Sequence, residues 1–424
     1  YMMTPSIQPQ ILNLKESATL SINQKALSMR KEGVDICHLG FGESPFPVPE
    51  IMVEALKQYS SRKNYLPGMG LPELRDAAAS VFHSEYELDS SRENTVVGPG
   101  SKELIFHLLM LLEGPFIIPA PSWVSYGPQA HILSKPVHTV STERKDSYRL
   151  QAGELNEVCK NLGTGQKILI LNNPCNPTGA VYPPQELEEL AQVCRDQNVV
   201  VISDEIYALI DFSGRKFVSI SKFYPEGTLV TGGLSKAFSA GGWRLGLTFV
   251  PKAMSSLIKP WNALISETYS CVSAPIQYGA LAAFENFEEI RPRIDQCCTI
   301  HSLAGSYLYR RFIKMNLNCP KPEGAFYLFP DFQNHREGLS KRGIFNCGEL
   351  VEDLLKRSKV AVLPGNDFYM KPENLCVRVA SVDYSGAEIL EHFPGLEKVN
   401  DDWIGERMPR LKLACDRIQE WVSK

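Results

Sequence analysis

The chain has 424 residues, of which 44% are hydrophobic and 22% are charged, and its formal net charge at pH 7 is −4. This length predicts two or three domains with at least one substantial core, and the composition excludes a disordered or fibrous protein. Because no run of basic residues gives the chain a positive patch, we do not expect DNA or RNA as a partner.

The cysteines and the apolar stretches bear on the protein's surroundings. Eleven cysteines are scattered without a Cys-x-x-Cys pair, which favours reduced thiols over a disulfide framework or a zinc site. Residues 1–5 contain no basic segment followed by an apolar one, so no secretory signal is expected. The most apolar stretch, residues 104–112, is shorter than the ~20 residues of a membrane-spanning helix. The sequence therefore predicts a soluble cytoplasmic protein with no membrane partner.

Apolar periodicity predicts helices and strands along the first two thirds of the chain. One or two short helices are expected over residues 10–32, ended by Gly33, and turn residues follow at 40–47. We then expect helices at 48–59, 72–83, 102–112, 123–133 and 184–197, and β-strands at 116–118, 167–171, 199–202, 228–231 and 245–250. The strands are almost wholly apolar and helices separate several of them, which is typical of a sheet buried on both faces. An α/β fold is predicted.

The pattern changes near residues 285–295, where we expect a domain boundary. A long helix is predicted over residues 284–315, and beyond it short strands at 326–329, 360–362 and 377–379 alternate with helices. This divides the chain into a large domain, residues 47–290, and a small domain formed by residues 1–46 and 291–424. Residues 397–424 form a charged helical pattern to which we assign no function.

Two short motifs are set aside. Residues 98–100 (GPG) begin like a dinucleotide-binding loop, but Glu103 stands where a third glycine is required. Cys297, Cys298 and His301 lie within the predicted long helix and lack the spacing of a zinc site. We therefore expect neither a nicotinamide cofactor nor a metal.

Four segments carry residue types that catalysis uses. They are residues 172–179 (NNPCNPTG), 203–207 (SDEIY), 235–246 (SKAFSAGGWRLG) and 376–380 (CVRVA). In their order and separations they resemble the pyridoxal-phosphate aminotransferases of fold type I, class I/II, and most closely the bacterial-type aspartate aminotransferase group. The resemblance spans residues 10–395. It implies pyridoxal 5′-phosphate (PLP) as the cofactor, a large α/β domain with a mostly parallel seven-stranded sheet between helices, and a smaller α/β domain.

The resemblance assigns the covalent attachment of the cofactor to Lys236, whose amine must be partly deprotonated to act as a nucleophile. Small residues at 239–242 allow a ligand to approach closely. Asp204 follows a buried strand and would pair with the ring nitrogen, which makes the ring a better electron sink. A helix N-cap is the alternative for Asp204. Tyr207 and Asn176 are expected to hydrogen-bond O3′, the phenolic oxygen attached to the cofactor ring (the ring oxygen), although each could be a turn or core residue.

The cofactor phosphate is expected to bind Ser101, Ser235 and Arg244. Ser101 opens a predicted helix, whose N-terminal amides attract anions, and Arg244 offers a bidentate guanidinium. The resemblance also implies that Tyr65 reaches the phosphate of a neighbouring subunit, so that a homodimer shares its active sites. Trp123 would stack on the ring, with a buried core tryptophan as the alternative.

Arg378 is expected to bind the α-carboxylate of the substrate through two parallel hydrogen bonds. A structural salt bridge is the alternative, because an arginine within an apolar strand is costly unless it is paired. Gly42 would let the backbone approach the same carboxylate. Trp123 and Asn176 are expected to contact the substrate as well as the cofactor.

Lys102 and the pair Ser17 and Thr19 match the residues with which this group reads a second carboxylate. They favour aspartate and glutamate as amino donors, although Lys102 could also be a solvated residue of a first helical turn. Lys102 is expected to contact the cofactor as well. Two departures from the family pattern bear on specificity, a short segment at 113–116 and the glycine pair at 241–242.

The sequence therefore predicts a homodimeric transaminase that works through two half-reactions, with amino acids and 2-oxo acids as substrates. A PLP-dependent C–S lyase, or a transaminase for aromatic amino acids, prephenate or alanine, would share nearly all of these residues. A ligand-sensing domain of a transcription regulator is a third candidate, but the roughly 40 residues before Gly42 leave no room for a DNA-binding domain.

Overall fold

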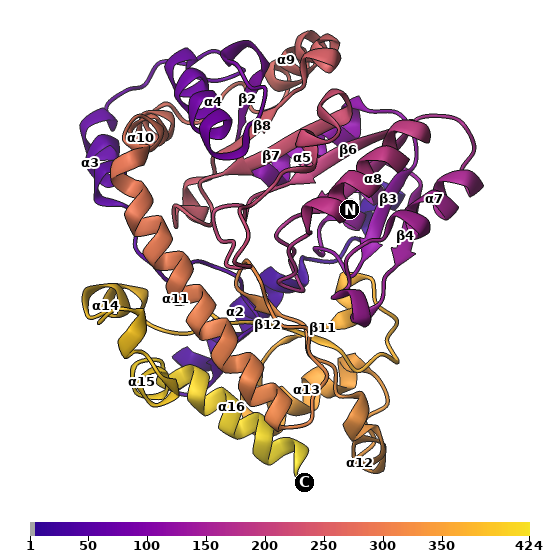
Figure 1. Ribbon diagram of the computed structural model, residues 1–424, viewed down its shortest axis with the longest axis vertical. Coiled ribbons are helices and arrows are strands. Elements are labelled where there is room, and N and C mark those ends of the chain that lie inside the picture. The colour runs from indigo at the N-terminus through magenta and orange to yellow at the C-terminus, as the bar shows by residue number, and fades with distance from the viewer. Residues whose placement is uncertain (1–4) are drawn as a thin grey trace.

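The computed structural model describes residues 5–424, so four of the five residues in which no secretory signal was found lie outside the described part. A seven-stranded sheet forms the centre of the larger body (Figure 1). Its strands, in spatial order, are β2 (Thr95–Gly98), β8 (Gly246–Phe249), β7 (Thr228–Gly233), β6 (Val199–Asp204), β5 (Lys167–Asn172), β3 (Phe116–Ala120) and β4 (Val137–Ser141). β8 runs antiparallel to β2 and β7, and the other neighbouring strands are parallel.

Both faces of this sheet are buried, as the apolar strands predicted. On one face, alternate residues of β5 and β6 such as Ile170 and Ile202 pack against α5 (Ser101–Leu111), α6 (Tyr126–Ile132) and α9 (Ile258–Ser266). On the other face, Leu171 and Val201 pack against α7 (Ala152–Asn161) and α8 (Pro184–Asp196). The predicted α/β fold with a mostly parallel sheet between helices is confirmed.

A second body contains two small sheets and the end of the chain. β1 (Cys37–His38) pairs in parallel with β10 (Val360–Ala361), and β12 (Val377–Ala380) lies between β11 (Leu363–Pro364) and β9 (Tyr327–Leu328) in an antiparallel sheet. The helices α13 (Cys347–Ser358), α15 (Asp401–Arg407) and α16 (Pro409–Val422) cover them, and their apolar residues share one core.

The long helix α11 (Phe287–Lys314) runs from one body to the other (Figure 1). Its first turns contribute Phe287 and Ile294 to the core beside the large sheet, whereas Ile300 and Phe312 belong to the core of the second body. We propose that the boundary between a large domain, residues 47–290, and a small domain lies at the start of this helix.

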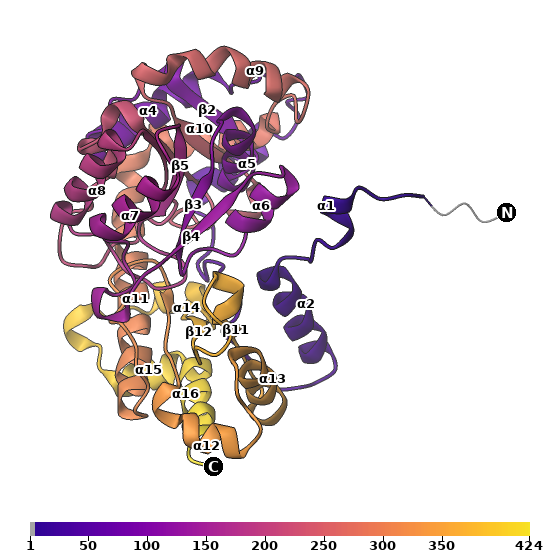
Figure 2. The same cartoon turned by 90° about the vertical axis from the view of Figure 1, so that its right-hand side faces the viewer.

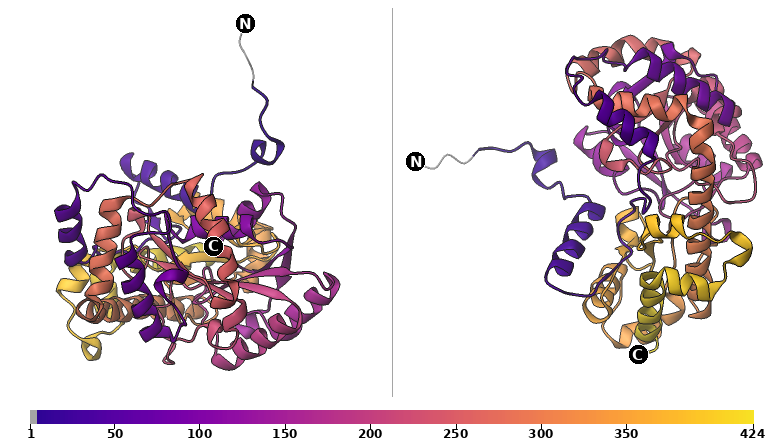
Figure 3. Two further views of the ribbon diagram at one scale, coloured as in Figure 1. Left: turned by 90° about the horizontal axis from the view of Figure 1, so that it is seen from above. Right: turned by 90° about the vertical axis from the view of Figure 1, so that its left-hand side faces the viewer.

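Several elements differ from the sequence prediction. The predicted long helix at 284–315 is confirmed as α11, but its first residues belong to α10 (Ala274–Glu285), a separate helix that was not predicted. The strand β4 and the helix α7 were not predicted. β4 is an edge strand whose alternate residues are exposed, so it lacks a continuous apolar run. The two predicted N-terminal helices are α1 (Pro9–Leu12), which extends outward in Figures 2 and 3, and α2 (Ala18–Lys31), which packs on the second body through the buried Ala26.

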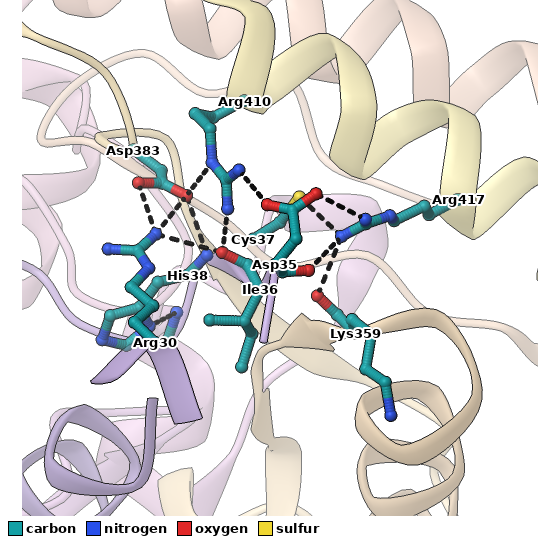
Figure 4. Close-up of polar contacts among 10 residues, drawn as sticks. Arg30, Asp35, Ile36, Cys37, His38, Lys359, Asp383, Arg410 and Arg417 are labelled. Atoms are coloured by element: carbon teal, nitrogen blue, oxygen red, sulfur yellow. Dashed lines mark hydrogen bonds and ion pairs between the residues drawn. The ribbon is translucent and has the colours of Figure 1, made fainter. Parts of the chain in front are cut away.

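The end of the chain is fastened to β1 by a polar network (Figure 4). Arg417 of α16 donates to Asp35 Oδ2 at 2.9 Å and to the Asp35 carbonyl at 2.8 Å, and Arg410 contacts the same carboxylate. Asp383, just after β12, accepts from Arg30 of α2 at 3.1 Å. The tail helix α16 therefore holds in place the strand that leads to Gly42.

The remaining helices are divided between the two bodies. The helices α3 (Glu50–Tyr59) and α4 (Pro72–Tyr86) pack with α10 beside the large sheet, while α12 (Arg336–Lys341) and α14 (Gly386–Glu391) lie in the second body. All eleven cysteines are free thiols, as expected. No helix within residues 5–424 is long and apolar enough to cross a membrane.

Candidate active site

A cavity of about 510 Å³ lies at the carboxyl ends of β5, β6 and β7 and extends to β12 and the residues after β1. Its lining includes every predicted site residue except Ser17 and Tyr65, namely Thr19, Gly42, Ser101, Lys102, Trp123, Asn176, Asp204, Tyr207, Ser235, Lys236, Arg244 and Arg378. Four segments that are far apart in the sequence therefore meet at one concave surface.

Asp204 is the last residue of β6 and its side chain is buried in the cavity wall. Its Oδ2 accepts a hydrogen bond from the Tyr126 hydroxyl at 2.6 Å, and Oδ1 accepts from the Ile206 amide at 3.3 Å. Burial raises the pKa of Asp204, and the hydrogen bond from Tyr126 opposes that rise. No helix begins at Asp204, so the N-cap alternative is wrong. A cationic partner would stabilise the negative charge of this buried carboxylate.

Lys236 lies in the loop after β7 and is half-buried. Its Nζ donates to the Gly42 carbonyl at 2.7 Å and lies 5.5 Å from the centre of the Tyr207 ring. The amine thus faces the cavity and not bulk water. Asp204 is close enough to Lys236 for the lysine's charge to lower the pKa of the carboxyl.

The N-terminus of α5 and Arg244 form a concave, positively charged corner. Gly100 adopts φ +95°, and a side chain there would meet Arg244 Nη2 at 2.3 Å, so only glycine fits between the helix and the guanidinium. Arg244 Nη1 donates to the Gly241 carbonyl at 2.7 Å. The first amides of an 11-residue helix and a guanidinium together attract a phosphate group. Ser101 and Ser235 line the same cavity.

Arg378 of β12 is only 1% exposed. It donates to Asn176 Oδ1 at 3.1 Å and to the Gly40 carbonyl at 2.7 Å, and its Nε has no partner. Within residues 5–424 no carboxylate lies within salt-bridge distance of it, so the structural salt bridge considered for this residue is wrong. Burial lowers its pKa. A buried cation without an anionic partner is prepared to bind an anion.

Lys102 follows Ser101 in the first turn of α5 and is not a solvated residue. Its Nζ lies 5.1 Å from the centre of the Trp123 ring. Burial lowers the pKa of Lys102, and the charges of Arg244 and Lys236 lower it further. Trp123 is itself only half-buried and borders the cavity, so it is not a core tryptophan. The hydroxyls of Thr19 and Ser17 share a hydrogen bond of 2.8 Å, and Thr19 lines the same cavity.

Tyr65 lies apart from the cavity of its own chain. Its side chain is 88% exposed, the largest exposure among the bulky apolar and aromatic residues. Three residues earlier in the chain, Arg62 lies within 5.7 Å of the ring centres of both Tyr59 and Tyr278, whose rings stack 4.4 Å apart. A large aromatic side chain that is exposed to this degree is typical of a surface that contacts a partner.

Sequence reasoning missed three cavity residues that orient the predicted ones. Tyr126 holds Asp204, Asn172 accepts from the Asn176 amide at 2.6 Å, and Tyr327 pairs its hydroxyl with that of Tyr207 at 2.7 Å. Asn172 begins the segment 172–179, and Tyr126 lies three residues after Trp123. Their closeness to predicted site residues in the sequence could have indicated them. Tyr327 stood in a predicted strand, and nothing in the sequence said which way it would point.

The cavity residues fit pyridoxal phosphate. A buried carboxylate suits the charged ring nitrogen, the corner at α5 and Arg244 suits the phosphate, Trp123 offers a flat surface, and Lys236 offers the amine. The donors come from rigid strand ends and a helix start, as expected of a preformed site.

Comparison with known proteins agrees with this geometry. Residues 34–390 match the family described as aminotransferase class I and II. The chain is 33% identical over 383 residues to the aspartate aminotransferase of Bacillus subtilis (strain 168), covering 87% of this chain and 93% of that one. It is 32% identical to a probable aspartate/prephenate aminotransferase of Aquifex aeolicus, with 86% and 92% covered.

Solved structures give the same result. The structure of the aspartate aminotransferase from Thermus thermophilus with maleate superposes with a TM-score of 0.84 at 28% identity, covering 98% of this chain and all of that one. The aspartate aminotransferase from Thermotoga maritima superposes with a TM-score of 0.80, also at 28% identity. With its motifs, its cavity and its relatives in agreement, the chain belongs to the class I and II aminotransferases and is a PLP-dependent enzyme of amino acid metabolism related to bacterial aspartate aminotransferases.

Proposed function

We propose that the protein is a cytoplasmic, homodimeric transaminase that moves an amino group between aspartate or glutamate and a 2-oxo acid in two half-reactions. The observation that carries the proposal is Arg378, a buried guanidinium without an anionic partner, which lies on the same cavity as Lys236 and Asp204. Every amino acid and 2-oxo acid substrate brings the carboxylate that such an arginine needs.

The residues around the cofactor each have a binding task. When bound, pyridoxal phosphate supplies an aldehyde that condenses with amines and a ring that accepts electrons. Asp204 holds a proton on the ring nitrogen by its negative charge, and Trp123 packs on the ring. Asn176 and Tyr207 bind the ring oxygen. Four groups hold the phosphate, and they are Ser101, Ser235, Arg244 and the first amides of α5.

Lys236 moves the proton that the reaction requires. With the cofactor bound, the Lys236 Nζ would take up the proton from the substrate α-carbon and hold it for its return. Arg378 and the backbone at Gly42 fix the substrate carboxylate, so that the α-carbon stays within reach of Nζ. The hydrogen bond from Nζ to the Gly42 carbonyl supports this role, because it keeps the amine beside the substrate-binding segment.

Lys102 supports the choice of dicarboxylic substrates. Its ammonium is partly buried against Trp123 and has no carboxylate within salt-bridge distance in the described part of the chain. Together with the hydroxyls of Ser17 and Thr19 it would bind the second carboxylate of aspartate or glutamate. The Bacillus subtilis relative is named an aspartate aminotransferase, which agrees with this choice.

The name of one relative keeps a second substrate open. The Aquifex aeolicus relative is named a probable aspartate/prephenate aminotransferase, and Leu20 and Phe41 give this cavity an apolar side. An aromatic or prephenate-like donor would pack against these two residues. We rank aspartate first because the cavity also holds an unpaired ammonium at Lys102.

The experiment is to incubate the PLP-loaded protein with aspartate and 2-oxoglutarate. We expect oxaloacetate and glutamate in equal amounts, with no ammonia released. Phenylalanine or alanine in place of aspartate measures the competing amino donors in the same assay. Glutamate as donor with prephenate as acceptor measures the prephenate reaction. Release of ammonia or pyruvate from cysteine or aspartate without a 2-oxo acid would instead support the C–S lyase alternative.

A further inference from the structure

Tyr327 of β9 is a buried residue that touches both the cofactor side and the substrate side of the cavity. It is 1% exposed, and its hydroxyl lies 2.7 Å from the Tyr207 hydroxyl. The plane of its ring faces the Arg378 guanidinium, whose central carbon lies 4.6 Å from the ring centre. Tyr327 therefore contacts both Tyr207, the proposed partner of the ring oxygen, and Arg378, the proposed partner of the substrate carboxylate.

The same hydroxyl also lies against Gly42. A Cβ atom built on Gly42 would meet the Tyr327 hydroxyl at 1.9 Å, so this glycine leaves the space that the hydroxyl occupies. The Gly42 carbonyl in turn accepts a hydrogen bond from Lys236. Tyr327 thus lies next to the backbone segment that holds the amine.

The position of Tyr327 is fixed from several directions. Its backbone pairs with Ala380 of β12, two residues after Arg378, and its ring packs edge-on against Tyr207 with centres 5.7 Å apart. Phe326 packs beside it, with ring centres 5.0 Å apart. Tyr207 belongs to the loop after β6 of the large sheet, whereas Tyr327 belongs to the second body, so their hydrogen bond joins the two.

We propose that Tyr327 is a positioning residue whose hydroxyl donates to the Tyr207 oxygen and whose ring supports the Arg378 guanidinium. The Tyr207 proton is then directed at the ring oxygen of the cofactor, and the guanidinium at the substrate carboxylate. This inference rests on the proposed roles of Tyr207 and Arg378, and it adds a residue to which no role has been assigned.

The consequence for the cofactor follows from the strength of one hydrogen bond. A hydroxyl that accepts a hydrogen bond becomes a stronger donor itself. A stronger donor to the ring oxygen stabilises its negative charge, so the cofactor-linked nitrogen of Lys236 loses its proton at a lower pH. The charged and titratable groups around the tyrosine pair are Asp204, Lys236, Arg378 and Asp367. None of them changes in a Tyr327→Phe variant.

The test compares Tyr327→Phe, which removes the hydroxyl alone, with Tyr327→Leu, which also removes the ring. The first readout is the absorbance of the PLP-loaded protein as a function of pH. The second is the Kd for succinate, a dicarboxylic acid without an amino group. For Tyr327→Phe we expect the midpoint of the absorbance change to rise by about 0.5–1 pH unit, with the succinate Kd within about twofold of the wild-type value. For Tyr327→Leu we expect the same rise and a Kd about fivefold weaker.

A double variant tells whether Tyr327 acts through Tyr207. If it does, Tyr207→Phe/Tyr327→Phe has the same midpoint as Tyr207→Phe alone. Equal midpoints for Tyr327→Phe and the wild type, or shifts that add fully in the double variant, would overturn the proposal. If Tyr327→Leu does not fold, as judged by circular dichroism, Tyr327→Phe and the double variant decide alone. A wild-type protein that takes up no pyridoxal phosphate overturns the proposed function together with this inference, whereas a pigmented one with an unshifted Tyr327→Phe overturns the inference only.

Discussion

Arg378 has fewer partners than its charge requires. Its hydrogen bonds go to one side-chain amide and one backbone carbonyl, and aromatic rings of Tyr327 and Phe368 cover it on either side. Rings and neutral acceptors offset part of the cost of burying a guanidinium, but a carboxylate offsets far more. The folded protein therefore holds the arginine ready for an anion that arrives with the substrate.

The variant Arg378→Lys tests this view, because lysine keeps the charge and loses the fork of two parallel donors. We expect kcat/KM to fall by about 100-fold for every amino donor, since the α-carboxylate is common to all of them. The measurement is steady-state kinetics with aspartate, glutamate and phenylalanine. Arg310→Lys, at an exposed ion pair with Asp401, is the matched control and should leave all three values unchanged. A loss confined to one donor would contradict the assignment.

In the proposed function Lys102 binds the second carboxylate of the substrate, so its removal should separate the donors. We expect Lys102→Ala to lower kcat/KM for aspartate about 10-fold or more while changing the value for phenylalanine less than threefold, because only aspartate brings a second carboxylate. The ratio of the two values is the measured quantity. A uniform loss would mean that Lys102 serves the cofactor alone.

Glu205 predicts a dependence of stability on pH. It is fully buried beside Asp204, its Oε1 accepts from Ser203 and Ser219, and burial raises its pKa from about 4.5 to about 7. The folded protein therefore binds this proton more tightly than the unfolded chain does. It follows that the folded state loses stability as the pH rises from about 4.5 through about 7, and that the loss is complete above pH 7.

The variant Glu205→Gln keeps the shape and cannot ionise. Relative to the wild type, we expect its free energy of unfolding to gain about 1–3 kcal/mol between pH 5 and pH 8. Urea unfolding of both proteins at the two pH values measures this difference, in which carboxyls common to both proteins cancel. An identical change with pH in the two proteins would show that Glu205 is already ionised at neutral pH.

At the scale of elements, the tail helix α16 stabilises the strand that carries Gly42. Arg417 reaches the Asp35 carboxylate, the Asp35 carbonyl at 2.8 Å and the Lys359 carbonyl at 3.5 Å, so it joins α16 to both strands of the β1–β10 pair (Figure 4). The charged helical pattern at residues 397–424 thus has a structural role, which the sequence did not indicate.

We expect Arg417→Ala to lower the free energy of unfolding by about 1–2 kcal/mol, because it removes the hydrogen bonds to the Asp35 carbonyl and carboxylate and the longer one to the Lys359 carbonyl. Lys412→Ala on the same helix is the matched control. Its ion pair with Asp416 is half-exposed, so we expect a change below about 0.5 kcal/mol. Thermal or urea unfolding of the two variants compares them directly. Equal losses would mean that the helix is held by its apolar face alone.

How far the elements could be predicted depended on how they are buried. The apolar runs of β5 and β6 are covered on both faces, so they stood out in the sequence, and the end of β6 placed Asp204 correctly. The edge strand β4 and the two-residue strands β1 and β11 carry no such signal, because side chains on them alternate between core and solvent or are too few. The predicted helix at 284–315 is confirmed as α11 but was started too early, since apolar spacing continues across a break at Asn286 that only backbone geometry reveals.

The candidate site was predictable where motifs carried it. Asn176, Asp204, Lys236 and Arg378 came from short segments, and the fold brings them to one cavity. Tyr327 was not predictable, because its role depends on the antiparallel pairing of β9 with β12, which puts it beneath Arg378. Contacts between the two bodies are tertiary, and local sequence carries no signal for them.

At the scale of the whole molecule, Tyr65 decides whether one chain is sufficient. Its side chain is 88% exposed and lies outside its own cavity, so it can serve a phosphate only in a second copy. A symmetric dimer would exchange the two tyrosines, each chain completing the other's site. In such a dimer, a chain with a defective Lys236 still supplies an intact Tyr65 to its partner.

Co-expression of Tyr65→Ala and Lys236→Ala chains, each with a different affinity tag, tests this arrangement. Purified heterodimers contain one site with both residues intact and one site with neither, so we expect about half of the wild-type activity per dimer. The assay uses a concentration of pyridoxal phosphate that saturates the wild type but not the Tyr65→Ala homodimer, and Lys236→Ala homodimers should be inactive. Heterodimers no more active than the mean of the two parents would mean that each chain builds its site alone, because the intact tyrosine and the intact lysine would then never meet.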